Sequence, residues 1–198
     1  MKKKTFVLLL ALVLIAGAAV GGTLAWLTDT TEAVQNTFTT SDIDITLTES
    51  KNLDLKMIPG WTIAKDPKVT VKANSEKCYL FVKIEKSSNF DNFMTYEMAV
   101  NSDETAIWTE LTGVNGVNGV YYRVVDASDE DQVFAVLKDD KVTVSGEVTK
   151  AMMNELTTAT YPTLTFTAYA SQYMKNNTES FTAAEAWDNV PKAPTTTP

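Results

Sequence analysis

The sequence predicts an all-β domain, built as an antiparallel sandwich of about eight or nine strands. Apolar and polar residues alternate with a period of two in several short segments, as in half-buried strands. Glycine, proline, asparagine and aspartate cluster between these segments, as expected of turns. Long amphipathic helices do not alternate with the strands, so a parallel α/β sheet is not expected. We place the sandwich domain at residues 49–190.

The first 25 residues have the layout of a secretory signal peptide. Three lysines at positions 2–4 precede an uncharged apolar run, Phe6–Val20, and small residues follow it. This layout predicts cleavage between Ala25 and Trp26 and a secreted or cell-surface location. The alternative is a retained membrane anchor, because the uncharged stretch Thr5–Leu27 is long enough to cross a bilayer core of about 30 Å.

Residues 26–48 form a polar segment that contains neither proline nor glycine. Near its end Ile43, Ile45 and Leu47 alternate with polar residues, which predicts a half-buried strand. Once cleavage frees this segment, it can pair with a sheet edge of its own chain or of a neighbouring chain. We therefore treat residues 26–48 as a candidate donor strand, whose apolar contacts come from Phe38, Ile43, Ile45 and Leu47.

The sandwich domain itself is expected to consist of short strands joined by turns. The strongest strand signal is Cys78–Lys86, in which Leu80, Val82 and Ile84 share one face. Two Asn-Gly pairs within residues 113–120 predict a hairpin. Residues 87–98 fit either a strand or a short helix. The remaining strands are expected around Val69–Val71 (with Thr70 and Lys72 facing outward), Ile107–Trp108, Tyr121–Val125, Val133–Leu137, Val142–Val148 and Leu164–Ala170.

Helical signals are confined to the last third of the chain. Lys150–Leu156 has room for one or two turns, and Phe181–Val190 is expected to form a short terminal helix. Thr182 and Glu185 have the spacing of a capping box for that helix. The end of the chain, residues 191–198, is predicted to be a disordered or linker-like tail.

Charge and cysteine content limit the possible partners. Removal of residues 1–25 takes three lysines and no acidic residue, so the net charge falls from −8 to −11. Such a polyanion is not expected to bind nucleic acid or an anionic membrane surface. The single cysteine, Cys78, has no partner for an internal disulfide. We expect it to pack as a small apolar residue, with an intermolecular bridge as the alternative.

The absence of histidine from the sequence argues against most hydrolytic chemistry. Ser-His-Asp and Cys-His arrangements and H-E-x-x-H zinc sites all need an imidazole. A pair of carboxylates remains possible in principle, but the 25 acidic residues are scattered and no pair stands out. We therefore expect no enzyme activity, no catalytic residues, no cofactor and no metal.

Two clusters offer weaker binding hypotheses. The acidic run at 126–131 supplies oxygen ligands for Ca²⁺, but its spacing differs from that of an EF-hand, and a solvated turn is the simpler interpretation. A set of aromatic residues could form a ligand platform, although such residues more often fill the core of a sandwich. The acidic residues are Asp126, Asp129, Glu130 and Asp131, and the aromatic ones are Trp61, Trp108, Tyr121, Tyr122, Tyr169 and Tyr173.

Several stretches of the chain also carry a family resemblance. The most specific is Gly21–Leu47, with Thr-Asp-Thr after the cleavage point and Asn36–Thr39 before an Ile-Asp-Ile strand. On these residues the chain resembles the SipW-dependent class of exported proteins, which a dedicated signal peptidase processes. That class includes the biofilm matrix proteins TasA and camelysin (CalY) of Gram-positive bacteria. Weaker similarity lies in Ile58–Gly60, Lys65–Val71, Phe166–Gln172 and Ala184–Trp187.

The resemblance implies a jelly-roll-like β-sandwich that is exported and assembled into extracellular fibres. In such fibres the freed N-terminal segment of one subunit completes a sheet of the next. The implied partners are other copies of the chain and a signal peptidase of the SipW type, and the membrane is contacted only through the uncleaved signal. Camelysin has also been classed as a metallopeptidase, but a chain without histidine offers that activity no visible zinc site.

Our first hypothesis is therefore a structural subunit of biofilm matrix fibres, with residues 26–48 as the donor strand. The first alternative is a monomeric cell-surface module that binds a glycan or a host protein. The second alternative is a camelysin-like peptidase.

Overall fold

The computed structural model describes residues 42–50 and 56–191. These residues belong to one compact unit, Ser41–Pro198. They form three antiparallel sheets and a few short helices, which confirms the all-β prediction. The expected signal peptide, its cleavage point at Ala25 and Trp26, and Phe38 lie outside the described residues.

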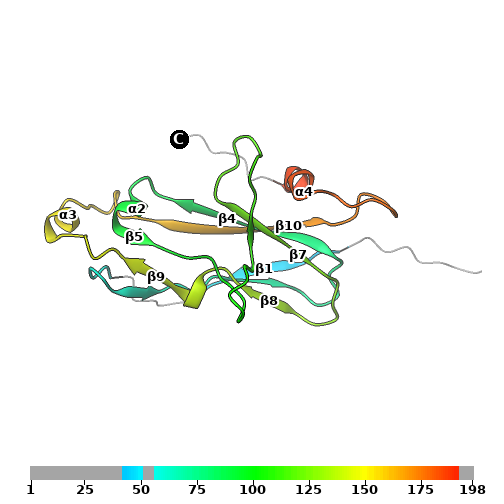
Figure 1. Cartoon of the computed structure of the whole chain (residues 1–198), viewed down its shortest axis with the longest axis horizontal. Helices are drawn as coiled ribbons and strands as arrows, with labels where there is room; N and C mark the ends of the chain where they lie inside the picture. Colours follow the sequence, from blue (N-terminus) through cyan, green and yellow to red (C-terminus); the bar gives the residue numbers. More distant parts are fainter. Residues whose placement is uncertain (1–41, 51–55, 192–198) are drawn as a thin grey trace, which may run out of the picture. The chain divides into compact units, whose positions relative to one another are not determined.

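One sheet, which we call sheet C, contains the two longest strands (Figure 1). Its strands follow the order β10-β4-β7-β6, so β10 and β6 are its edges. The pairing register places Leu164 of β10 opposite Lys86 of β4, and Cys78 of β4 opposite Val125 of β7. The bounds are Cys78–Lys86 for β4, Thr109–Glu110 for β6, Val120–Val125 for β7 and Leu164–Gln172 for β10.

Two smaller sheets each contain three strands. Sheet A has the order β1-β3-β8, and sheet B has the order β2-β9-β5. Sheet A consists of β1 (Ile45–Thr48), β3 (Lys68–Val71) and β8 (Gln132–Ala135), and sheet B of β2 (Thr62–Ala64), β9 (Lys141–Val144) and β5 (Met94–Thr95). The short helices are α2 (Phe90–Phe93), the 3-10 turn η1 (Lys138–Asp140), α3 (Lys150–Asn154) and α4 (Ala183–Asn189).

Strand β4 separates two apolar clusters, because successive side chains of a strand point to opposite faces. Leu80 and Val82 are fully buried in the larger cluster, which also includes Val69 of sheet A and Val144 of sheet B. On the opposite face, Phe81 packs against Trp187 of α4 with ring centroids 5.3 Å apart. Sheet C is thus covered by sheets A and B on one side and by α4 on the other (Figure 1).

The cap of α4 confirms the expected capping box. The Thr182 hydroxyl accepts a hydrogen bond from the backbone N–H of Glu185, and the Glu185 carboxylate accepts one from the backbone N–H of Thr182 at 2.8 Å. Lys175 also forms an ion pair with Glu185. These contacts fix the start of the helix that covers the outer face of sheet C.

The predicted hairpin is present in the structure, but the start of one strand and the exposure of Thr70 differ from the predictions. The hairpin is present: Leu111 donates to the Val120 carbonyl oxygen at 2.8 Å, and β6 pairs with β7. However, β6 begins at Thr109, after Ile107 and Trp108. Thr70 was expected on an exposed face, but it is buried at 8% exposure between Thr46 and Val133 in the middle strand of sheet A. A central strand is shielded by both neighbours, which sequence alternation does not reveal.

Candidate strand-accepting groove

An apolar groove of about 1060 Å³ opens between sheets B and C. Ile63 of β2 and Met94 of β5 line it from sheet B, and Leu164 lines it from sheet C. Met153 and Leu156, in and just after α3, close one wall, and Phe90 of α2 contributes a ring. The groove is therefore a gap in the side of the domain where the two layers do not meet.

The β10 strand borders this groove and is an edge of sheet C. Ser87 donates to the Thr163 carbonyl oxygen at 3.1 Å, and Tyr173 donates to the Lys77 carbonyl oxygen at 3.3 Å. In an antiparallel ladder such hydrogen-bonded pairs alternate with pairs whose backbone groups point away. The even-numbered residues of β10, from Leu164 to Gln172, therefore direct their N–H and C=O groups outward. Within residues 42–50 and 56–191, no strand is hydrogen-bonded to that side of β10, but β1 lies close to β10, and Leu164 and Thr165 are the residues of β10 that line the groove.

The β2 strand borders the groove as an edge of sheet B, and its backbone follows the same alternation. Val144 donates to the Trp61 carbonyl oxygen and Lys65 donates to that of Asp140, each at 2.8 Å. The intervening residues Thr62 and Ala64 consequently direct their backbone groups away from β9. In the part of the chain that the structure describes, this edge also has no partner strand.

A tight turn places the apolar side chain of Ile58 in the lining of the groove. Trp61 donates to the Ile58 carbonyl oxygen at 3.0 Å across Pro59 and Gly60, and Gly60 has φ +76. Proline followed by a residue with positive φ is the pattern of a type II turn. Ile58 remains 42% exposed and Trp61 63% exposed. The groove thus combines unpaired backbone with exposed apolar surface, which is what an added β-strand requires.

The predicted donor residues lie partly inside the domain. Ile45 and Leu47 belong to β1, opposite Val71 and Val69 of β3 in the same chain. Ile43 also packs against the main core. Of the two pairings left open by the sequence, residues 45–48 therefore adopt the one within their own chain. The sheet begins before residue 49, and the donor role of the preceding residues stays a prediction.

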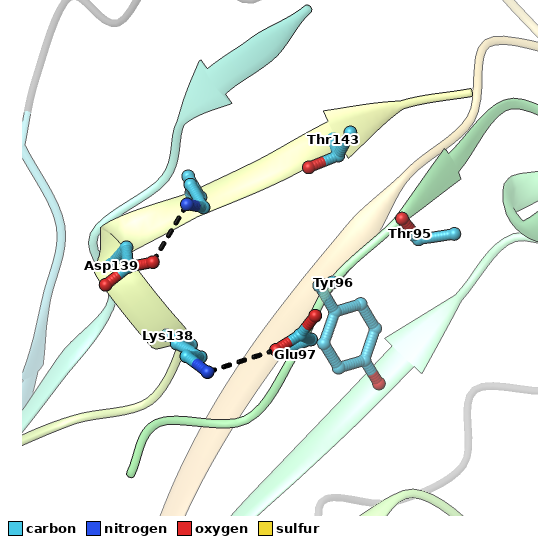
Figure 2. A pocket seen from close by; sticks show the side chains of 7 residues that line it. Thr95, Tyr96, Glu97, Lys138, Asp139 and Thr143 are labelled. Carbon is cyan, nitrogen blue, oxygen red and sulfur yellow. Dashed lines mark hydrogen bonds and ion pairs between the residues drawn. The ribbon is translucent and has the colours of Figure 1, made fainter. Parts of the chain in front are cut away.

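A second, smaller pocket of about 250 Å³ lies beside η1 and is lined by polar residues (Figure 2). Lys138 is 3.2 Å from Glu104 and 3.6 Å from Glu97, and Lys141 is 2.8 Å from Asp139. The hydrogen bond from Lys141 lowers the pKa of Asp139, and that to Glu104 raises the pKa of Lys138. The lowered pKa keeps Asp139 ionised at neutral pH, so its carboxyl group is not poised as a general acid.

The structure does not bring the six aromatic residues of the hypothetical platform together. Trp61 is exposed, whereas Trp108 is 3% exposed and donates its indole N–H to the Ala135 carbonyl oxygen. Tyr121 and Tyr122 are adjacent in β7 and pack in different apolar clusters. Tyr169 and Tyr173 pack in the cluster beneath α4.

The acidic run at 126–131, between β7 and β8, contacts the connection between β3 and β4. Asp131 accepts hydrogen bonds from the Ala73 backbone N–H and the Lys72 ammonium, both at 2.9 Å. Asp126 forms an ion pair with Lys77 at 2.8 Å. No group of three or more acidic, cysteine or histidine side chains in the described ranges is placed to hold a metal ion. Asp126 and Asp131 thus serve the turn between β7 and β8.

Comparison of the chain with family models, with curated proteins and with solved structures finds no match. Among residues 42–50 and 56–191, no helix has both the length and the apolar character needed to span a membrane.

Sequence reasoning did not find the groove. Its lining comes from segments as distant as Ile58, Phe90, Met153 and Leu164. The sequence marks turns by their proline and glycine residues, but it does not reveal the strand order that makes β2 and β10 edges of their sheets. Only that order turns scattered apolar residues into one continuous surface.

Proposed function

We propose that this protein is an exported structural subunit of extracellular fibres, with a jelly-roll-like domain that accepts a β-strand from a neighbouring copy. The observation that carries the proposal is the apolar groove lined by residues of β2 and β10, each of which is an edge of its own sheet. Its occupant in the fibre is the segment from Trp26 to Ser41 of the next subunit, freed by cleavage after Ala25.

The length and composition of that segment support this assignment. Its 16 residues, fully extended, reach about 50 Å, which exceeds the length of the nine-residue strand β10. It contains six threonines and no proline or glycine, so it favours an extended conformation. Val34 and Phe38 are separated by four positions and therefore fall on the same face of a strand, where both side chains can enter the groove.

The arrangement would propagate without closing. A segment at the beginning of the chain that fills a groove on another copy makes a heterologous contact, and such contacts generate filaments when the rotation does not close a ring. Before cleavage, the signal segment tethers residues 26–41 to the membrane. Assembly would therefore follow export and processing by a signal peptidase of the SipW type.

The proposal is tested with two matched variants of the processed chain, residues 26–198. Ile58→Glu places a charge in the lining of the groove. Val133→Glu places the same charge on β8, an edge strand of sheet A that does not line the groove. Ile58 and Val133 are 42% and 57% exposed, so both variants should fold. We expect Ile58→Glu to abolish fibres seen by electron microscopy and Val133→Glu to leave them intact.

Fibres that persist in Ile58→Glu, or that disappear equally in Val133→Glu, would contradict the assignment of the groove. Deletion of Trp26–Thr40 should leave a folded chain that does not polymerise, as judged by sedimentation and circular dichroism. The uncleaved precursor should likewise fail to form fibres.

A second function, a monomeric binding module for a glycan, is favoured by one observation. Trp61 and Tyr161 are 63% and 52% exposed, and Tyr161 lines the groove. Exposed aromatic rings stack on apolar faces of ligands. Sedimentation as a monomer at all concentrations, together with a rise in melting temperature on adding a glycan, would support this function in place of fibre assembly.

A further inference from the structure

The loop between β6 and β7 contains the same four-residue sequence twice. Val114-Asn115-Gly116-Val117 overlaps Val117-Asn118-Gly119-Val120, so both asparagines have identical neighbours on either side. Both asparagine side chains are exposed. A difference in their chemistry in the folded protein must therefore come from the fold and not from the adjacent sequence.

Asparagine followed by glycine is labile in water, because glycine has no Cβ to shield its backbone nitrogen and restricts rotation little. The deprotonated glycine nitrogen attacks Cγ of the asparagine side chain. A bond forms between that nitrogen and Cγ, the bond from Cγ to Nδ2 breaks, and the amide nitrogen leaves as ammonia. Water then opens the cyclic imide at one of its two carbonyls, which gives aspartate or isoaspartate. No oxidant or enzyme is needed.

Ring closure at Asn118 is opposed by the contacts of Gly119 with β4. The Gly119 carbonyl oxygen accepts a hydrogen bond from the Ile84 backbone N–H at 2.7 Å. A Cβ built on Gly119 would lie 2.5 Å from the Ile84 carbonyl oxygen, so the two main chains are in close contact. The peptide between Asn118 and Gly119 cannot rotate into the imide geometry unless this end of the hairpin separates from β4.

Gly116 has no such restraint. Nothing lies within 4 Å of the position that a Cβ would take on it. The turn is closed by one hydrogen bond, from the Val117 N–H to the Val114 carbonyl oxygen at 3.2 Å. Gly116 and Gly119 have similar positive φ values, +74 and +66. The two glycines therefore differ in their packing and not in their backbone conformation.

We propose that Asn115 is a deamidation site of the folded protein and that packing of Gly119 on β4 protects Asn118. The product carries a new carboxylate at the exposed turn, and the isoaspartate form also has one additional methylene in the main chain. This proposal does not depend on fibre formation.

The test compares two variants of the full chain, each with one reactive asparagine: Asn118→Gln leaves Asn115, and Asn115→Gln leaves Asn118. Each is incubated at mildly alkaline pH, both folded and in denaturant, and loss of the side-chain amide is followed by peptide mass spectrometry, with isoaspartate assayed separately. We expect the folded chain to lose the Asn115 amide about tenfold faster than the Asn118 amide. In denaturant the two rates should become equal, because the local sequences are the same.

Equal rates in the folded chain, or faster loss at Asn118, would overturn the proposal. Faster loss of the Asn115 amide in both the folded and the denatured chain would also overturn it, because the difference in rate would then not come from the fold. Circular dichroism of both variants before incubation shows whether they are folded. If one is not folded, the wild-type protein is incubated instead, and fragmentation of the peptide that contains both asparagines gives the rate at each site.

Discussion

Gly119 and Ile84 join the hairpin loop to the central strand of sheet C through their main chains. Ile84 donates its N–H to the Gly119 carbonyl oxygen at 2.7 Å, and its own carbonyl oxygen would lie 2.5 Å from a Cβ at position 119. A side chain cannot be added there unless backbone moves.

Gly119→Ala should therefore destabilise the fold, by more than about 1 kcal/mol in urea unfolding. Gly116→Ala is the matched control, because Gly116 also has positive φ but no neighbour within 4 Å. Its cost should be limited to the strain of the left-handed backbone. Equal losses in the two variants would show that the contact with Ile84 contributes nothing beyond that strain.

Arg123 is the single arginine of the chain, and its charge has no ionic partner among the described residues. Its guanidinium lies 3.8 Å from the ring centroid of Phe134, and its Nε is buried without a hydrogen-bond acceptor. Burial lowers the pKa of this group. Replacing an unpaired, partly buried charge with an apolar side chain of similar length removes a desolvation cost.

We expect Arg123→Met to be neutral or stabilising, with a change of no more than about 1 kcal/mol in urea unfolding. Arg123→Ala should be destabilising, because it also removes the stem that packs against Phe134. A large loss of stability in Arg123→Met would mean that the contact of the charge with the ring outweighs its desolvation.

Glu185 makes the stability of the domain depend on pH in the acid range. The hydrogen bond from Lys175 and those from Thr182 lower its pKa from 4.5 to about 2 in the folded chain. A group whose pKa falls on folding stabilises the fold above its unfolded pKa, and this contribution is lost as the pH falls through the folded pKa. Glu185→Gln should therefore be less stable than the wild type at neutral pH.

The difference between the two proteins should shrink as the pH falls from about 4.5 towards 2. Thermal unfolding at a series of pH values measures it. Glu76→Gln is the control, because no ion pair or side-chain hydrogen bond of Glu76 occurs within the described ranges. A difference that stays constant from neutral pH to pH 2 would show that the carboxylate charge is not responsible.

Cys78 should be chemically inert in the folded chain. Its side chain is fully buried in the main core, and burial raises the pKa of its thiol to about 11. The thiolate is the reactive form, so very little of it exists at neutral pH. A thiol reagent should modify Cys78 only at the rate of unfolding, and rapid modification once denaturant is added confirms that the reagent is competent. Fast labelling of the native chain would revive the alternative of an intermolecular disulfide.

Local patterns predicted the strands better than they predicted the surface. The two faces of β4 followed from alternation, because Leu80 and Phe81 each pack in a cluster on their own side. The capping box at Thr182 and Glu185 followed from spacing. Such features are decided by residues a few positions apart, which is the range over which sequence patterns are informative.

Long-range pairing decided the features that were missed. Thr70 is buried because β3 has strands on both sides, and the groove exists because β2 and β10 do not. Ile45 and Leu47 fit either an internal or a donated strand by their pattern, and only the register with β3 shows the pairing within the chain. Strand order depends on contacts between distant segments, so a single sequence does not determine it.

The indole of Trp108 occupies one of the outward backbone groups of the edge strand β8. The Val136 N–H bonds to the Pro67 carbonyl oxygen, so Ala135 of β8 directs its own carbonyl outward. The Trp108 indole N–H occupies that carbonyl at 2.8 Å, which leaves Val133 as the one residue of β8 with both outward backbone groups unpaired among the described residues. If strands add to sheet edges as proposed, this occupied carbonyl makes β8 a poorer acceptor than an edge whose backbone groups are all unpaired. A Trp108→Phe variant removes the N–H, so strand addition along β8 is the outcome to look for in that variant.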